Sequence, residues 1–235
     1  MDILRFITAG NVDDGKSTLI GRLLYDTKNI KDDVLESVAK PDGSDAAINL
    51  AYLTDGLRAE REQGITIDVA YKYFTTPQRK YIITDAPGHF QYTKNLVTGA
   101  SGVDAIIILI DALNGITPQT RRHSQVAAFL HIKNVVVAIN KMDAQDYNET
   151  VYNSIKADYM VIGQQLGLSA ITFIPISALA GDNVLQPSHK MPWYSGQTLM
   201  AWLENCSAPA VDFEEVRFSV QCSIAQPDSS AVGFA

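Results

Sequence analysis

The sequence predicts an α/β fold with a mostly parallel six-stranded sheet and helices on both faces. Apolar β-branched runs, such as "AIIILI" at 105–110 and "VVVAI" at 135–139, have the length of buried strands and are too short for membrane spans. Helix-like stretches separate these runs, and such alternation is typical of a parallel sheet covered on both sides. With 235 residues, 46% of them hydrophobic, the chain can bury a full-sized core.

The expected elements follow one another in a regular order. Strands are predicted over residues 3–9, 65–74, 80–86, 104–112, 134–140 and 170–177. Helices are predicted from about residue 16 and over 91–101, 119–131, 149–166 and 196–205. The segment "TTPQ" joins the second and third strands as a hairpin, which makes one strand an antiparallel edge. Ligands of such sheets bind outside the carboxyl ends of the strands, so strand-end residues are the first candidates for a site.

We expect two units, residues 1–208 and residues 209–235. The first holds all of these elements, whereas after Pro209 an acidic linker and one strand pattern follow, as at the start of a second, β-rich unit. Within the first unit, the polar stretch from 24 to 65 contains "KPDGSD" and a possible short helix over 50–63. A long irregular connection of this kind is usually a functional or disordered loop, and we expect it to be mobile.

Composition and charge narrow the classes of protein that fit. The formal net charge is -7 and no basic run is visible, which disfavours a self-sufficient nucleic-acid binder. The N-terminal "MDILRFI" lacks the features of a secretory signal, so we expect a cytoplasmic protein without a membrane segment. Cys206 and Cys222 have no CxxC partner and are interpreted as reduced thiols.

The stretch "GNVDDGKS", from Gly10 to Ser17, fits the pattern G-x-x-x-x-G-K-S directly after a strand and before a helix. In that setting backbone N–H groups converge on phosphates at a helix N-terminus. The Lys16 ammonium would reach the β- and γ-phosphate oxygens, and the Ser17 hydroxyl would bind Mg²⁺. The expected phosphate-binding residues are Asn11, Val12, Asp13, Asp14, Gly15, Lys16, Ser17 and Thr18.

The tetrapeptide "NKMD", with Asn140, Lys141 and Asp143, follows the strand "VVVAIN" and indicates which base is bound. The Asp143 carboxylate can accept hydrogen bonds from N1–H and the exocyclic amine of guanine, whereas adenine offers no such pair of donors. A buried carboxylate left unpaired would cost about 1–3 kcal/mol or more, which is enough to select guanine. The segment "ISALAG" after the last strand adds Ser177, Ala178 and Leu179 as expected contacts to the ring.

Two further motifs would meet the γ-phosphate. In "DAPGH" at 85–89, Asp85 ends a strand and would hold Mg²⁺ through water, and the Gly88 amide would contact the γ-phosphate. His89 stands where a group that orients the attacking water is needed. In "GITID", Thr66 lies at the end of the polar stretch and would close over Mg²⁺ and the γ-phosphate. We therefore expect Lys16, Thr66 and His89 to act in hydrolysis and Ser17, Thr66 and Asp85 to hold the metal.

Taken together, these motifs resemble the translation-factor class of P-loop GTPases over essentially residues 3–206. Within that class, longer stretches are similar to the GTPase subunits of bacterial ATP sulfurylases: "DDGKSTLIGRLLYDTK", "DGLRAEREQGITIDVAYKYF", "PGHFQYTKNLVTGAS", "QTRRHS" and "GDNVLQPSHKMPWYSGQTL". The elongation factor 1 alpha group shares "AERE", "GITID" and the "WY-G-TL" pattern, but "LIGRLLYDTK" and "QYTKN" depart from it.

The resemblance implies the same nucleotide and metal residues named above, with Val12 and Ile65 as an apolar pair flanking the catalytic histidine. It implies GTP or GDP with Mg²⁺ as cofactors, and a separate, smaller subunit that makes adenosine 5'-phosphosulfate from ATP and sulfate. Members of that family continue into two β-barrels, so residues 209–235 would begin the first. Phe90 and the C-terminal "VQCSIAQPDSSAVGFA" depart from the family pattern.

Two alternatives remain open at the level of the sequence. A translation elongation or release factor would use the same nucleotide motifs but would need a surface for tRNA or the ribosome. An ATP-using kinase or structural ATPase would share the phosphate loop and is opposed by "NKMD".

Overall fold

The computed structural model describes residues 2–30, 50, 69–168 and 170–207, and two short paired strands, β7 (Ser223–Ala225) and β8 (Val232–Phe234). Of the predicted short helix over 50–63, only Leu50 is described. The first part of the predicted strand over 65–74, with Ile65 and Thr66, lies outside the described residues.

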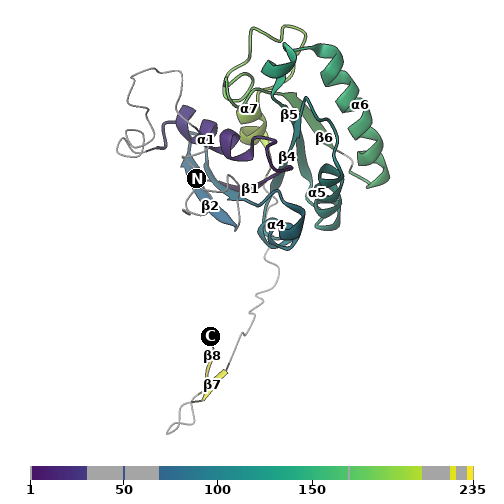
Figure 1. Ribbon diagram of the computed structural model, residues 1–235. Helices are drawn as coiled ribbons and strands as arrows, with labels where there is room; N and C mark the ends of the chain where they lie inside the picture. Colours follow the sequence, from purple (N-terminus) through teal and green to yellow (C-terminus); the bar gives the residue numbers. More distant parts are fainter. Residues whose placement is uncertain are drawn as a thin grey trace.

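Six strands form one sheet, and the sequence-based prediction of its size and mostly parallel character is confirmed (Figure 1). The spatial order is β2-β3-β1-β4-β5-β6. Only β2 runs antiparallel, and it lies at the edge beside its hairpin partner β3, as predicted. The bounds are β1 Ile3–Ala9, β2 Ala70–Thr75, β3 Lys80–Asp85, β4 Ala105–Asp111, β5 Asn134–Asn140 and β6 Ile171–Pro175.

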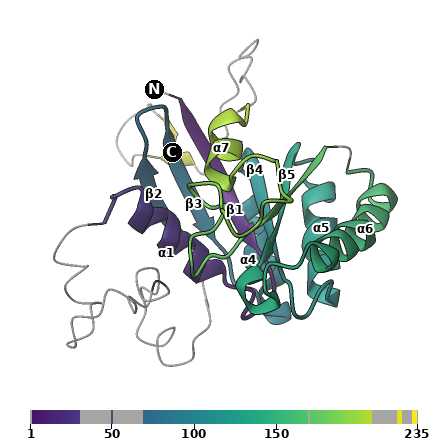
Figure 2. The same cartoon turned by 90° about the horizontal axis from the view of Figure 1, so that it is seen from above.

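Helices cover both faces of the sheet (Figures 1 and 2). Alternate side chains of a strand point to opposite faces, so Ile107 and Leu109 of β4 join one hydrophobic cluster while Ile106 and Ile108 join the other. The first cluster includes side chains of α1 and α7, and the second includes side chains of α4, α5 and α6. The bounds are α1 Lys16–Asp26, α4 Thr93–Ala100, α5 Pro118–Phe129, α6 Glu149–Gln165 and α7 Leu199–Asn205.

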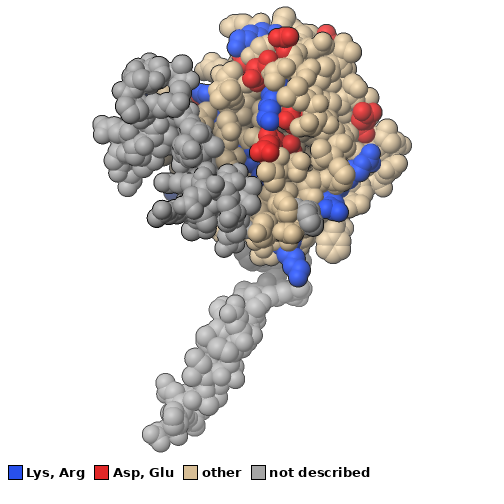
Figure 3. Space-filling view, in the orientation of Figure 1, with Lys and Arg blue, Asp and Glu red and all other residues tan. Residues whose placement is uncertain are grey.

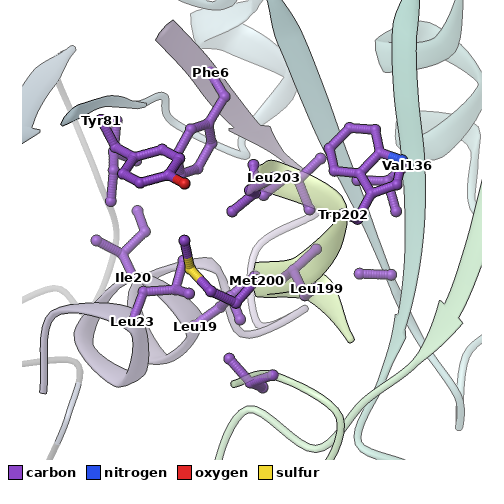
Figure 4. Packing of buried hydrophobic residues seen from close by; sticks show 14 of the residues in the cluster. Phe6, Leu19, Ile20, Leu23, Tyr81, Val136, Leu199, Met200, Trp202 and Leu203 are labelled. Atoms are coloured by element: carbon purple, nitrogen blue, oxygen red, sulfur yellow. The ribbon is translucent and has the colours of Figure 1, made fainter. Parts of the chain in front are cut away.

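Apolar side chains hold α1 and α7 against the sheet (Figure 4). Leu19, Ile20 and Leu23 of α1 are fully buried there. Phe74 and Tyr81, on paired strands, stack with ring centroids 4.4 Å apart. Full burial of such side chains stabilises the fold by about 1.5–3 kcal/mol each. This packing also holds the first turn of α1 in place, and with it the loop Gly10–Ser17.

Capping residues explain why the helices begin where they do. Pro118 opens α5 behind the Thr117 N-cap, whose hydroxyl accepts a hydrogen bond from the Thr120 amide. The last helix begins at Leu199, three residues later than predicted, because the Thr198 side chain caps it by accepting from the Ala201 amide at 3.2 Å. Predicted and observed ends of α4, α5 and α6 differ by at most two residues.

None of the helices in the described part of the chain has both the length and the apolar character that crossing a bilayer requires. On the face drawn in Figure 3, the coloured acidic and basic side chains are interspersed. Cys206 is a buried free thiol, and burial raises its pKa to about 12.

His123 of α5 is buried in the neutral form. Its Nε2 atom accepts a hydrogen bond from the Gln119 amide nitrogen at 3.1 Å, and Arg122 fixes the orientation of that amide by donating to its oxygen. Burial lowers the pKa of His123 to about 3, and repulsion by Lys16 and Arg122 acts in the same direction. An imidazolium at this place would therefore destabilise the fold.

The first testable prediction concerns acid stability. Between the ordinary histidine pKa of 6.5 and the folded value of about 3, the unfolded chain binds more protons at His123 than the folded chain. This residue should therefore reduce the free energy of unfolding as the pH falls through that window, by up to about 1.4 kcal/mol per pH unit. His123→Gln should flatten the profile measured by urea unfolding between pH 7 and 5. His189→Gln, at an exposed histidine, is the control, and equal slopes for all three proteins would contradict the prediction.

Candidate nucleotide-binding site

Five parallel strands end at one edge of the sheet and place the predicted site residues there. The phosphate loop follows β1, Asp85 ends β3, Asn140 ends β5, and Ser177 comes two residues after the end of β6. Asp111, which the sequence analysis did not select, ends β4. The carboxyl ends of parallel strands meet at the same edge, so this topology gathers motifs that are up to 167 positions apart in the chain, from Gly10 to Ser177.

The Lys16 side chain is folded back over the phosphate loop. Its ammonium donates hydrogen bonds to the carbonyl oxygens of Asn11 at 2.8 Å and Gly10 at 3.2 Å. The residue is buried, and burial lowers the pKa of Lys16 although Asp85, Asp14 and Asp13 favour the charged form. An anion beside this ammonium would offset the cost of its burial, which is the chemistry expected of a phosphate site.

The Asp14 side chain forms a hydrogen bond within its own loop. It is buried, and its Oδ2 accepts a hydrogen bond from the Asn11 amide at 2.5 Å. Burial raises the pKa of Asp14 to about 6, although the Asn11 hydrogen bond and the Lys16 charge oppose that shift. The carboxylate thus stabilises the loop through its bond to the Asn11 amide, and any contact of Asp14 with phosphate would come from its backbone amide.

Gly88 brings the loop after β3 against the phosphate loop. A Cβ atom at this position would lie 2.7 Å from the Gly10 carbonyl oxygen and 2.8 Å from the Asn11 carbonyl carbon, and it would also collide with the Lys16 ammonium. Only glycine allows this approach. Asp85 is buried three residues earlier, and the partly buried His89 comes next, with its ring 6.0 Å from that of Tyr92. The structure thus places the start of "DAPGH" beside Lys16.

The Asn140 side chain connects the base-binding loops to the phosphate loop. Its Nδ2 donates to the Asp14 carbonyl oxygen at 2.8 Å, and its Oδ1 accepts from the Ala178 amide at 2.9 Å. Both bonds are buried. The Ala178 amide, predicted to face the guanine ring, is thus engaged by Asn140 in this structure.

Lys141 and Asp143 take different positions in the "NKMD" loop. Lys141 adopts a left-handed backbone with φ 62°, and its ammonium forms an ion pair with Asp111 at 2.8 Å. Asp143 lies in the short 3₁₀ helix η4 (Met142–Gln145) and is half-buried. Among the described residues, nothing forms a hydrogen bond with its carboxylate, so its oxygens are available to the two donors of a guanine ring.

Arg22 holds the loop after β6, and the sequence analysis missed it. From α1, its Nε donates to the Ala178 carbonyl at 3.1 Å, and its Nη2 donates to the Leu179 carbonyl. Ser177 shapes the same loop by accepting the Ala180 amide on its Oγ at 3.1 Å, whereas the Leu179 side chain is exposed. In sequence, an arginine on an amphipathic helix is indistinguishable from an ordinary solvated residue, so no signal pointed to it.

The metal prediction rests on two described residues. Ser17 is the second residue of α1, next to Lys16, and Asp85 is a buried carboxylate close enough to favour the charged form of that lysine. Mg²⁺ typically takes one or two protein oxygens together with phosphates and waters, and these side chains fit that pattern. No group of three or more potential metal-binding side chains occurs among the described residues, so the phosphates would have to complete the coordination.

The fold and the strand-end loops define a P-loop nucleotide-binding domain of the GTP-binding type. The family model described as "Elongation factor Tu GTP binding domain" matches residues 1–209. The chain therefore belongs to the elongation factor Tu GTP binding domain family.

Two similar curated proteins are both called sulfate adenylyltransferase subunit 1. The protein from Cellvibrio japonicus (strain Ueda107) is 57% identical over 225 residues, which cover 94% of this chain and 48% of that protein. The protein from Pseudoalteromonas atlantica (strain T6c / ATCC BAA-1087) is 53% identical over 239 aligned residues, which cover 100% of this chain and 51% of that protein. The chain thus spans about half the length of these relatives.

Two solved structures share the fold. A bacterial selenocysteine-specific elongation factor, EF-Sec, is 27% identical with a TM-score of 0.59, covering 77% of this chain and 26% of that one. The GTP-bound Ski7 GTPase-like domain of S. cerevisiae reaches a TM-score of 0.74 at 20% identity, covering 86% of this chain and 49% of that one. At that identity the second likeness concerns the fold alone.

The second testable prediction concerns Arg22. Arg22→Ala should weaken GDP binding about 10- to 100-fold, because the part-buried Ala178 carbonyl and the exposed Leu179 carbonyl of the loop after β6 would lose a charged donor. Arg22→Lys should recover only part of the affinity, since one ammonium cannot reproduce the two-pronged contact. The measurement is titration with a fluorescent GDP analogue. Arg121→Ala, at an exposed arginine of α5, is the control, and wild-type affinity for Arg22→Ala would rule out the positioning role.

Proposed function

We propose that this chain is the GTP-hydrolysing part of a sulfate adenylyltransferase. In this proposal, GTP hydrolysis is coupled to the formation of adenosine 5'-phosphosulfate from ATP and sulfate, and a separate, smaller subunit catalyses that formation. The observation that carries the proposal is the 57% identity, over 94% of the chain, to a protein called sulfate adenylyltransferase subunit 1. The nucleotide motifs lie together at one sheet edge, which supports a working GTP site.

The chain's own residues would perform the hydrolysis as follows. GTP would enter with its phosphates on the loop Gly10–Ser17, and Lys16 would move from the carbonyls it now contacts to the β- and γ-phosphate oxygens. His89, beside Gly88, would orient the water for in-line attack. Ser17, Asp85 and Thr66 would hold Mg²⁺, which supplies neutralisation of the phosphate charge when bound. Asp143 would read the guanine ring.

The alternative function is that of a translation elongation or release factor. It draws support from the fold and from the 27% identity to the elongation factor EF-Sec. The much higher identity to the sulfate adenylyltransferase subunits favours the first proposal. An ATP-using enzyme is disfavoured because the free Asp143 carboxylate suits the two donors of guanine, which adenine lacks.

The third testable prediction concerns His89. His89→Ala should keep GDP affinity but slow GTP hydrolysis about 100-fold or more, as expected for a residue that positions the attacking water. Single-turnover phosphate release and GDP titration measure the two quantities separately. The exposed His131 offers the control variant His131→Asn, because asparagine tolerates the left-handed φ of 54° found there. Wild-type turnover by His89→Ala would remove this residue from the mechanism.

The fourth testable prediction addresses the proposed function itself. Full-length protein, purified with its partner from its own cells, should release pyrophosphate from ATP in a sulfate-dependent reaction that GTP accelerates. Lys16→Ala should abolish the acceleration, because the γ-phosphate would lose its cation. A complex without sulfate-dependent release, carrying tRNA or ribosomes instead, would give first place to the translation-factor alternative.

A further inference from the structure

The edge strand β2 presents outward-facing backbone groups. In an antiparallel ladder, residues alternate between positions bonded to the partner strand and positions directed away from it. The hairpin bond from the Thr76 amide to the Arg79 carbonyl, 3.0 Å long, sets this alternation. With Thr75 opposite Lys80 and Tyr73 opposite Ile82, the amides and carbonyls of Thr75, Tyr73 and Tyr71 are therefore directed away from β3.

The outward backbone groups of Thr75 are already paired, by the side chain of Asn29 in the place of a neighbouring strand. The Asn29 Oδ1 atom accepts from the Thr75 amide at 3.1 Å, and its Nδ2 donates to the Thr75 carbonyl at 3.0 Å. A carboxamide has the same donor and acceptor as a peptide group, so this contact reproduces one rung of a sheet. Within the described residues, the backbone groups of Tyr71 and Tyr73 have no corresponding partner on this side.

Both tyrosines also stand exposed over a groove. Tyr71 is 54% exposed and Tyr73 is 66% exposed, although tyrosine usually buries much of its ring. With Ile82, Thr84, Val103 and Arg5 they line a hollow of about 340 Å³ between β2, β3, β1 and the end of α4. Among the described residues, Arg5 is the only charged side chain lining this hollow, and its guanidinium forms no ion pair there.

These observations identify the chemistry of the occupant. Unpaired peptide groups on a strand edge are best satisfied by another extended backbone, and tyrosine and arginine are the residue types enriched at protein interfaces. The isolated guanidinium favours a carboxylate beside that backbone. A second copy of this chain is a poorer occupant, because its net charge of -7 would act against close association with itself.

We propose that the β2 edge and its tyrosine groove bind an extended segment of the smaller catalytic subunit, which adds as a strand along β2 and places an acidic side chain at Arg5. The identity of this partner rests on the proposed function. Ala70 of β2 is the register partner of Asp85, so the added strand would run beside the element that carries the expected metal-binding carboxylate. The surface that binds the partner and the expected metal-binding carboxylate would then lie on the same hairpin, formed by β2 and β3.

The fifth testable prediction is the experiment on this edge. Full-length protein is titrated with the smaller subunit, and the dissociation constant is measured for the wild type, Tyr73→Pro and Arg5→Glu. Proline removes the outward N–H and is tolerated at strand edges, so Tyr73→Pro should weaken association about 10-fold or more while GDP affinity stays unchanged. Arg5→Glu should weaken it to a similar degree through charge repulsion, about 10-fold.

Matched controls are available elsewhere on the described surface. Phe129→Ser removes an aromatic ring that is 77% exposed at the end of α5, and Arg121→Glu reverses an exposed charge on the same helix. Both should leave the dissociation constant within about twofold of wild type, as substitutions outside an interface do.

The outcomes separate the two proposals. A wild-type protein that hydrolyses GTP but does not bind the smaller subunit would overturn the proposed function, and this inference with it. A wild-type complex whose affinity is unchanged by Tyr73→Pro and Arg5→Glu would overturn the β2 inference alone. If Tyr73→Pro loses GDP binding and is thus misfolded, Arg5→Glu decides.

Discussion

The site depends on one buried carboxamide, that of Asn140. Its two hydrogen bonds, to the Asp14 carbonyl and from the Ala178 amide, tie the phosphate loop to the loop after β6. The backbone on both sides has to fit this side chain: Gly15 has φ 92°, and a Cβ atom there would collide with the Asn140 amide. An aspartate at position 140 would offer no donor to Asp14, and an alanine would leave two buried backbone groups unpaired. The loops expected to bind the base and the phosphates are therefore held in a fixed mutual position.

Charge balance imposes the second constraint. Lys16 is buried with its ammonium on carbonyl oxygens, and Asp14 is buried with its carboxylate on an amide, so neither charge is neutralised by a direct ion pair among the described residues. Burial accordingly lowers the pKa of Lys16 and raises the pKa of Asp14, and both shifts favour the neutral form of the group. A phosphate would give Lys16 the anion it lacks, so ligand binding would offset the free-energy cost of burying this cation. Phosphate binding would thus stabilise the loop.

Much of this arrangement was predictable from sequence because it is local or periodic. The six-stranded sheet follows from apolar runs such as that of β4, and the position of Lys16 follows from the spacing of the glycines around it. Arg22 was missed because its partners, Ala178 and Leu179, lie 156 and 157 residues away and contribute only backbone carbonyls, which carry no residue-type signal. The inward turn of Asp14 was missed for a related reason, since its partner is a backbone amide. Thr66 lies outside the described residues and stays a prediction.

The contact between Gly88 and Lys16 has a mechanical consequence. The two residues lie so close that even a methyl group at position 88 would not fit, so a movement of Lys16 onto a γ-phosphate would also change its contact with the loop after β3. That loop is bounded by the fixed strand β3 on one side and by η3 (Phe90–Tyr92) and α4 on the other. Since β3 is held between β2 and β1, we expect phosphate entry to displace the loop toward η3 and α4. His89 lies in this loop, so we expect the residue that would orient water to reach its place only when the γ-phosphate is present.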